Sequence, residues 1–248
     1  MTLVLVHGNP ETSAIWDDLI PLLPTDDIVI LSPPGFGAPL PEGFDATMSG
    51  YLKWLIEQVS QLKPPIDLIG HDWGGGHVVR LACERPDLIR SWTSDILGIF
   101  NPEYVWHERA QIWQTPGEGE KAVAEMISAP LSEKIEFYKE RGMSDSISGQ
   151  VSEWVNEDMA KSILTLYRSA AQPVVGNLFD SLKKASAKPG LAIIATADPA
   201  VGGEVLGRKS AEQTGAQIGI LEGVAHWWMC THPKQSAQLL NSFLSQFE

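Results

Sequence analysis

The feature that most constrains the fold is the segment Gly70-His71-Asp72-Trp73-Gly74. A mainly apolar segment at residues 66–69 leads into it, and apolar residues at helical spacing follow it. A side chain at the tip of so tight a turn needs small residues two positions away on each side, and Gly70 and Gly74 supply them. The segment therefore predicts a strand–turn–helix unit with Asp72 at its tip. This is the context of a nucleophile elbow, with Asp in place of the more familiar Ser.

Strand and helix patterns alternate along the chain. Strands are expected at residues 3–6, 28–31, 66–69, 89–96, 191–195 and 218–221, and helices at residues 13–23, 51–59, 78–85, 204–214 and 233–247. Strands that alternate with helices typically form a parallel sheet that is covered on both faces. The sequence thus predicts an α/β fold with a mostly parallel, six-stranded sheet flanked by helices.

Residues 101–188 have a different character. They contain Trp106, Trp113 and Trp154 and several helical patterns, but no convincing strand. We interpret this segment as a helical cap inserted into a core formed by residues 1–100 and 189–248. Ligands of open α/β sheets bind at the carboxyl edge of the strands, so the cap is expected to cover the site.

Composition excludes several classes of function. The chain has 248 residues and a formal net charge of −13, which disfavours nucleic acid and anionic membrane surfaces as partners. Its apolar runs are too short to span a membrane, and no basic segment precedes residues 3–6, so we expect no signal peptide. Cys83 and Cys230 fit inert thiols of a cytoplasmic protein. Nothing in the sequence specifies an oligomeric state.

Asp72 and His226 are the first two candidate catalytic residues. A carboxylate nucleophile suits an electrophilic sp³ carbon that carries a leaving group, because it attacks without prior deprotonation and forms an ester. His226 lies in Gly223-Val224-Ala225-His226-Trp227-Trp228, which follows the last expected strand. From there it could activate the water that hydrolyses this ester.

Two further motifs follow strands. Asp198, in Ala197-Asp198-Pro199, could hold the second nitrogen of the histidine, although Asp95 at the end of the preceding strand competes for this role. The loop His7-Gly8-Asn9-Pro10 could supply backbone N–H groups to an oxyanion, together with the N–H of Trp73.

These motifs, with Pro34-Gly35-Phe36-Gly37, resemble those of α/β-hydrolases of the epoxide hydrolase and haloalkane dehalogenase branch. The resemblance implies that Asp72 is the nucleophile, His226 the base and Asp198 the acid of a triad, with an oxyanion hole at Asn9 and Trp73. It implies no cofactor, and the scattered histidines suggest no metal site. The chain starts almost at the oxyanion loop, without the two-strand hairpin usual in the family, so one sheet edge should be trimmed.

Epoxide hydrolysis to a diol is the leading expectation. The pair Tyr167-Arg168 and the segment Gln114-Thr115-Pro116-Gly117 resemble cap segments of epoxide hydrolases, although Arg109 occupies the place of their first cap tyrosine. We expect Tyr167 and His107 to assist ring opening. The substrate, a small apolar epoxide or halide, should lie among aromatic side chains, which are Trp73, Trp106, Trp113 and Trp227.

Dehalogenation is the main alternative. Some haloalkane dehalogenases hold the departing halide with side chains at the positions of Asn9 and Trp73. Fluoroacetate-type dehalogenases need arginines beside the nucleophile, where this chain has Trp73 and glycines, so a short haloacid substrate is disfavoured. Ester or lactone hydrolysis, and a non-catalytic ligand-binding role on the same scaffold, are further alternatives.

Overall fold

The computed structural model describes residues 2–247 and contains a six-stranded, fully parallel sheet. The strand order is β2-β1-β3-β4-β5-β6, and each neighbouring pair is parallel. The strands are β1 (Thr2–Val6), β2 (Ile28–Leu31), β3 (Ile66–Gly70), β4 (Ser91–Ser94), β5 (Gly190–Ala195) and β6 (Gln217–Leu221). The predicted α/β-hydrolase architecture is confirmed.

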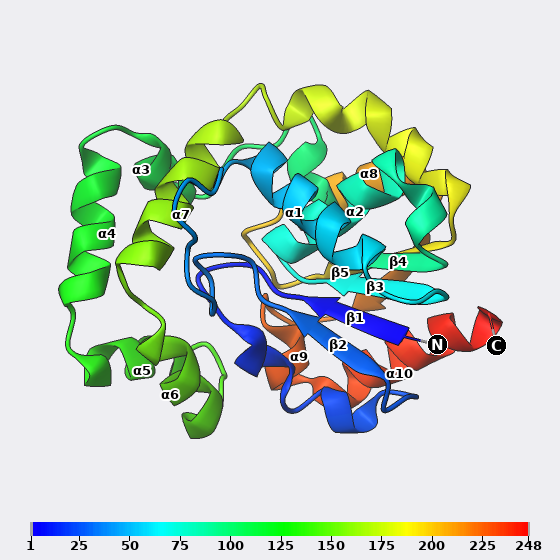
Figure 1. The fold of residues 1–248 in the computed structure, drawn as a ribbon, viewed down its shortest axis with the longest axis horizontal. Coiled ribbons are helices and arrows are strands. Elements are labelled where there is room, and N and C mark those ends of the chain that lie inside the picture. The colour runs from blue at the N-terminus through cyan, green and yellow to red at the C-terminus, as the bar shows by residue number, and fades with distance from the viewer. Residues whose placement is uncertain (1, 248) are drawn as a thin grey trace.

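Helices cover both faces of this sheet (Figure 1). Helices α1 (Met48–Ser60), α2 (Trp73–Glu84) and α8 (Gly203–Thr214) lie on one face, and α9 (Trp228–Thr231) and α10 (Pro233–Leu244) lie on the other. Strands β3 and β5 are buried along their whole length. Burial on both faces explains why β5 reads as a continuous apolar run, whereas the one charged residue of β3, Asp67, forms an ion pair with Arg90.

Two expected elements differ from the structure. Residues 13–23 form two short 3₁₀ helices, Ser13–Trp16 and Ile20–Leu22, instead of one helix. Thr12 caps the first, but Pro21 has no N–H to continue a helical ladder. The fourth strand covers only residues 91–94 of the expected 89–96, because a 3₁₀ turn at Pro86–Leu88 delays its start and the chain leaves the sheet at Asp95.

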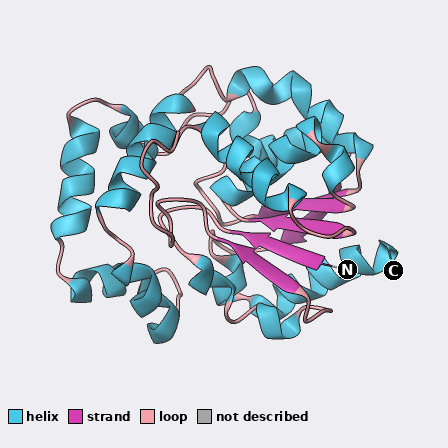
Figure 2. Ribbon diagram, viewed as in Figure 1, coloured by secondary structure: helices cyan, strands magenta, loops and turns pink. Residues whose placement is uncertain are grey.

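Five helices follow the fourth strand and lie beyond the carboxyl ends of the strands, toward which the arrows in Figure 2 point. They are α3 (Glu108–Gln114), α4 (Glu118–Ser128), α5 (Leu131–Lys139), α6 (Asp145–Glu153) and α7 (Glu157–Ser169). This helical insertion resembles a cap. The 3₁₀ segment Gly176–Ala187 instead packs against α2 and α8, so the division of the chain at residues 101 and 188 stays a prediction.

Among residues 2–247, no helix combines the length and the apolar character that crossing a membrane requires. Both cysteines are free thiols, and burial raises the pKa of Cys83 to about 11.

Candidate active site

Asp72 lies at the sharp turn between β3 and α2, as the motif predicts. Its φ of 50° makes it the one non-glycine residue with positive φ in the described chain. A Cβ at position 70 would come within 2.5 Å of the Gly75 backbone, and one at position 74 within 2.2 Å of the Val6 carbonyl oxygen. Glycine is therefore required on both sides of the turn. Such a strained conformation is typical of functional sites.

Asp72, His226 and Asp198 come together at the carboxyl edge of the sheet. His226 Nδ1 lies 2.7 Å from Asp198 Oδ2, and His226 Nε2 lies 3.7 Å from Asp72 Oδ2. A backbone hydrogen bond joins the loops that carry Asp198 and His226, because the N–H of Ala197 donates to the carbonyl of Val224 at 3.0 Å. The geometry matches a nucleophile, a base and an acid that orients the base.

The electrostatics of these three residues differ sharply. Burial raises the pKa of the Asp72 carboxyl to about 6. Burial alone would lower the pKa of His226, but the charge and hydrogen bond of Asp198, with a smaller contribution from Asp72, raise it to about 9. Burial would raise the pKa of Asp198, but the charge of His226 keeps it below its ordinary value. A carboxylate–imidazolium pair thus faces a nucleophile that ionises near neutral pH.

The loop after β1 places Asn9 against the nucleophile. The backbone N–H of Asn9 donates to Asp72 Oδ1 at 3.0 Å. The side-chain amide of Asn9 and the indole N–H of Trp73 are both buried, and neither has a hydrogen-bond partner among residues 2–247. Buried polar groups are rarely left unpaired, so two of them beside a nucleophile are suited to bind a ligand atom.

Aromatic side chains of the cap close over Trp73. The Tyr167 ring lies 5.7 Å from that of Trp73, 5.4 Å from that of Trp106 and 4.8 Å from that of Trp113, between ring centroids. The cluster therefore contains three of the four tryptophans expected to line the substrate site.

The cap tyrosines differ in what their hydroxyls do. Tyr104 and Tyr138 donate to the carbonyls of Ala200 and Pro10, at 2.5 and 2.6 Å. Within the described chain, the Tyr167 hydroxyl makes no such bond to a carbonyl and instead interacts with the side chain of Trp73. Burial raises its pKa well above the ordinary value. Tyr167 thus stays protonated and keeps its O–H available as a donor.

His107 and Trp227 are both engaged in local contacts. His107 Nδ1 accepts the N–H of Ala110 at 3.2 Å and caps α3, and burial lowers the pKa of its imidazole to about 4. His107 is thus neutral at pH 7, with its ring centroid 6.3 Å from that of Tyr167. The Trp227 ring lies 5.1 Å from that of His226, and its indole N–H donates to Glu11.

Asp95, the competing candidate for the acid, contacts the other side of the elbow. It accepts hydrogen bonds from three donors, namely His71 Nδ1 at 2.5 Å, Trp228 Nε1 at 2.7 Å and the backbone N–H of Asp72 at 2.9 Å. In the structure Asp198, rather than Asp95, is the partner of His226.

Glu11 and His71 are two residues that our sequence reasoning missed. Glu11 Oε2 lies 3.5 Å from His71 Nε2, and Glu11 Oε1 accepts the N–H of Gly8 at 2.8 Å. Burial disfavours the charged form of both residues. The attraction between them, and the attraction of Asp95 for His71, outweigh this effect of burial. The pKa of Glu11 is lowered to about 2, and that of His71 is raised well above 6.5. A charged residue two positions after Asn9, in the loop expected to lie beside the nucleophile, was the available signal.

The ligand atoms of Glu11, His71 and His226 lie within 4.8 Å of one another, which is the spacing of a possible metal site. Both histidines have raised pKa values and already face carboxylates. Metal ligation requires neutral imidazole, so this cluster fits an ion-pair network better than a metal site.

Comparison with known proteins identifies the fold of this chain. The model of the alpha/beta hydrolase family matches residues 3–239. A haloalkane dehalogenase of Mesorhizobium japonicum is 27% identical over 140 residues, which are 50% of this chain and 43% of that protein. A soluble epoxide hydrolase of Corynebacterium sp. is 33% identical over 92 residues, which are 35% of this chain and 31% of that protein. The matched part of the chain thus spans less than half the length of these curated relatives.

Solved structures agree at the level of the fold. The crystal structure of a haloalkane dehalogenase from Bradyrhizobium elkani superposes with a TM-score of 0.76 at 19% identity, covering 99% of this chain and 90% of that one. From the match over residues 3–239 and this shared architecture, we conclude that the chain belongs to the alpha/beta hydrolase family.

Proposed function

We propose that this hydrolase removes halide from small haloalkanes through a covalent ester on Asp72. The observation that carries the proposal is the pair of buried, unpartnered donors beside the nucleophile, the Asn9 amide and the Trp73 indole. The similarity to haloalkane dehalogenases supports the same choice. It replaces epoxide hydrolysis, which the sequence motifs favoured, as the leading function.

In the first half-reaction, one carboxylate oxygen of Asp72 attacks the carbon that bears the halogen. A C–O bond forms, the C–halogen bond breaks, and its electron pair leaves with the halide. The side-chain N–H groups of Asn9 and Trp73 donate hydrogen bonds to the departing anion. These hydrogen bonds are stronger than they would be in water, because the site is buried.

In the second half-reaction, Asp72 is esterified and no longer carries the charge that helps to raise the pKa of His226, so the imidazolium can lose its proton to solvent. The neutral His226 then takes a proton from water, and the hydroxide attacks the ester carbonyl. Asp198 stabilises the imidazolium that forms. The backbone N–H of Asn9 already contacts a carboxylate oxygen of Asp72, so it can hold the oxyanion of the tetrahedral intermediate together with the backbone N–H of Trp73. Collapse of this intermediate releases the alcohol and restores Asp72, and the proton leaves from His226.

Epoxide hydrolysis is the second candidate, and Tyr167 is the observation that favours it. Its protonated hydroxyl lies in the cap over Trp73 and could donate to the oxygen of an opening epoxide. His107 is neutral at pH 7 and could add an Nε2–H donor but no strong acid. The assembled Asp72, His226 and Asp198 argue against a purely ligand-binding role, which requires none of them.

A product assay separates the two functions. Wild-type protein is incubated with 1-bromobutane and with styrene oxide, and bromide and diol are measured. The Asn9→Ala variant keeps its backbone N–H, so it should lower bromide release by about tenfold or more through the lost side-chain donor alone. Tyr167→Phe should leave bromide release nearly unchanged. Diol without bromide, with loss of activity in Tyr167→Phe, would instead establish epoxide hydrolysis, and neither product would contradict both.

A further inference from the structure

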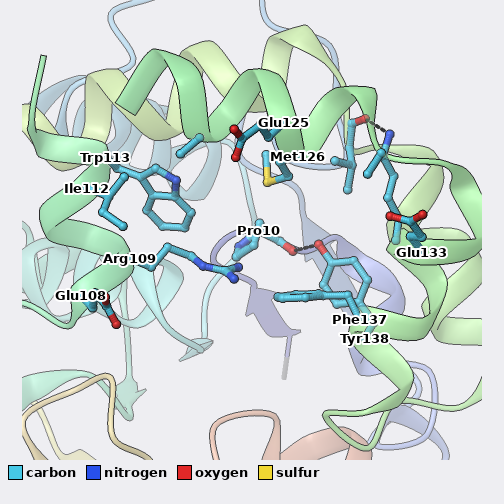
Figure 3. A pocket seen from close by; sticks show the side chains of 14 residues that line it. Pro10, Glu108, Arg109, Ile112, Trp113, Glu125, Met126, Glu133, Phe137 and Tyr138 are labelled. Atoms are coloured by element: carbon cyan, nitrogen blue, oxygen red, sulfur yellow. Dashed lines mark hydrogen bonds between the residues drawn. The ribbon is translucent and has the colours of Figure 1, made fainter. Parts of the chain in front are cut away.

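Two tyrosine hydroxyls of the helical insertion bind loops that carry catalytic groups. Tyr138, on α5, donates to the carbonyl of Pro10 in the oxyanion loop, and Figure 3 shows this hydrogen bond at one wall of a groove in the insertion. Tyr104 lies between β4 and α3 and donates to the carbonyl of Ala200 at 2.5 Å. Ala200 is two residues after Asp198, so it is Tyr104 that reaches the loop of the triad acid.

Asp198 and Ala200 form one turn after β5. Asp198 Oδ1 accepts the backbone N–H of Ala200 at 2.8 Å, while Oδ2 faces His226 Nδ1 at 2.7 Å. A displacement of Ala200 would therefore move the carboxylate that orients the imidazole. Pro199 is exposed and Ala200 only half-buried, so packing alone holds this turn weakly. The hydrogen bond from Tyr104 supplies a fixed point.

Tyr104 is itself firmly held. Its side chain is buried, its N–H donates to the carbonyl of Asn101 at 2.9 Å, and its own carbonyl accepts the side-chain N–H of Gln172 at 3.3 Å. Its ring lies edge-on to that of Trp106, which stacks on Trp73, with centroids 5.0 and 5.9 Å apart. Burial raises the pKa of the Tyr104 hydroxyl above its ordinary value, so it stays protonated. It can therefore donate throughout the neutral pH range.

We propose that Tyr104 is a positioning residue for hydrolysis of the ester on Asp72. Through the carbonyl of Ala200 it holds the turn of Asp198. The Asp198 carboxylate can then orient His226 and stabilise the imidazolium that forms. The inference rests on the proposed function, because it concerns the second half-reaction of that mechanism. Attack by Asp72 on the substrate does not use His226, so ester formation should not depend on Tyr104.

Tyr104→Phe removes the hydroxyl and keeps the ring, and Tyr51→Phe is its matched control. Tyr51, on α1, is also buried, and its hydroxyl donates to the carbonyl of Pro34 at 2.7 Å. Pro34 lies outside the loops that carry the triad and the oxyanion hole. Each variant thus loses one buried hydrogen bond from a tyrosine to a carbonyl, but only Tyr104→Phe releases the turn of Asp198.

The kinetic test is a single turnover of 1-bromobutane with enzyme in excess, at a pH above the titration of His226, where the imidazole is neutral in every variant. Bromide reports ester formation, and intact-mass spectrometry after rapid acid quench gives the alkyl-enzyme, whose decay reports hydrolysis. In Tyr104→Phe, hydrolysis should slow by about five- to tenfold, the effect of losing one hydrogen bond, while bromide release stays within about twofold. Tyr51→Phe should keep both rates. Equal slowing of both steps in Tyr104→Phe, or unchanged hydrolysis, would overturn the inference.

A second readout does not depend on turnover. The Tyr104 oxygen also interacts with the backbone of His107, so a measurement on the pair of Asp198 and His226 itself is needed. NMR of ¹⁵N-labelled histidines follows the titration of His226, whose signal is assigned by its loss in His226→Ala. The charge and hydrogen bond of Asp198 raise the pKa of His226 to about 9, so a looser turn should lower it.

The titration midpoint of His226 should fall by roughly 0.5 pH units or more in Tyr104→Phe and stay unchanged in Tyr51→Phe. Both variants keep the other titratable groups that face His226, namely Asp72, His71, Glu11 and His107. An unchanged midpoint in Tyr104→Phe would overturn the inference whatever the kinetics. Failure of the wild type to release bromide would instead contradict the proposed function, while a lowered midpoint would still support the positioning of Asp198 by Tyr104.

Discussion

His226 Nε2 and Asp72 Oδ2 face each other across 3.7 Å, which is longer than a hydrogen bond. The other carboxylate oxygen, Oδ1, accepts the N–H of Asn9 at 3.0 Å. The nucleophile is therefore held by the oxyanion loop rather than by the base. This separation fits two successive roles, in which Asp72 attacks first and His226 acts only on the ester that results.

Removing the base should trap that ester. In His226→Ala, Asp72 can still attack 1-bromobutane, but no group remains to activate water. Intact-mass spectrometry should show a stoichiometric butyl adduct, and peptide mapping should place it on Asp72. Asp72→Asn serves as the control and should show none. An unmodified His226→Ala protein that still consumed the substrate would contradict this role.

The rate of ester formation should depend on the ionisation of Asp72. Burial raises its pKa to about 6, so the carboxylate form dominates above this pH and the neutral acid below it. We expect kcat/KM to rise with pH through about 6 and then to level off. A pH profile from 4.5 to 8 measures this, and a flat profile over that range would show that Asp72 ionises elsewhere or does not attack.

The same shift predicts a stability cost. The folded-state pKa of Asp72 lies above its unfolded value near 3.8, so ionisation destabilises the fold progressively as pH rises from about 4 to 6 and fully above 6. Asp72→Asn removes the charge and should be more stable than the wild type above pH 6, by roughly 1–3 kcal/mol. Urea unfolding at pH 4 and pH 8 should show a gain at pH 8 that largely disappears at pH 4. A gain that is equal at both pH values would rule out ionisation as its cause.

Much of this site could be predicted from local sequence. The elbow carries its own signal, since a turn this tight needs Gly70 and Gly74 beside Asp72. Parallel strands all end at one edge of the sheet, so placing Asp198 and His226 after strands was enough to predict that they meet there.

What could not be predicted depends on contacts between distant segments. Asp95 and Asp198 both follow strands, and only the structure shows that His71 and Trp228 engage Asp95. Glu11 was missed because its partners, His71 and Trp227, lie far away in the sequence. The helical pattern of residues 13–23 was misread because it was given more weight than Pro21.

Asp95 and Asp198 should respond differently to the loss of their negative charge. Asp95→Asn would leave the cation of His71 without one of its two carboxylates and place an amide against three donors, so it should destabilise the fold by about 3 kcal/mol or more. Asp198→Asn should instead slow ester hydrolysis and allow the alkyl-enzyme to accumulate. Thermal unfolding and intact-mass measurements separate these effects, and accumulation of ester in Asp95→Asn alone would reverse the assignment.

Gly8 should be indispensable for activity because of its contact with the nucleophile. A Cβ there would lie 2.2 Å from Asp72 Oδ1, so Gly8→Ala must displace the carboxylate. We expect bromide release to fall by about 10² or more, since misplacement of a reacting group by 1 Å has such an effect. Gly149→Ala is the matched control, because its Cβ would meet no atom within 4 Å, and this helical position should gain about 0.5–1 kcal/mol with unchanged activity. Equal activity of the two variants would contradict the placement of Asp72.

The most direct test of the account is a single turnover in ¹⁸O-labelled water, with enzyme in excess over 1-bromobutane. If Asp72 forms the ester and water attacks its carbonyl, the alcohol takes its oxygen from the unlabelled carboxylate, and ¹⁸O appears in the peptide that contains Asp72. The account predicts unlabelled butanol and a labelled peptide after this first cycle. Labelled butanol with an unlabelled peptide would show that water attacks the substrate directly, and would contradict covalent catalysis by Asp72.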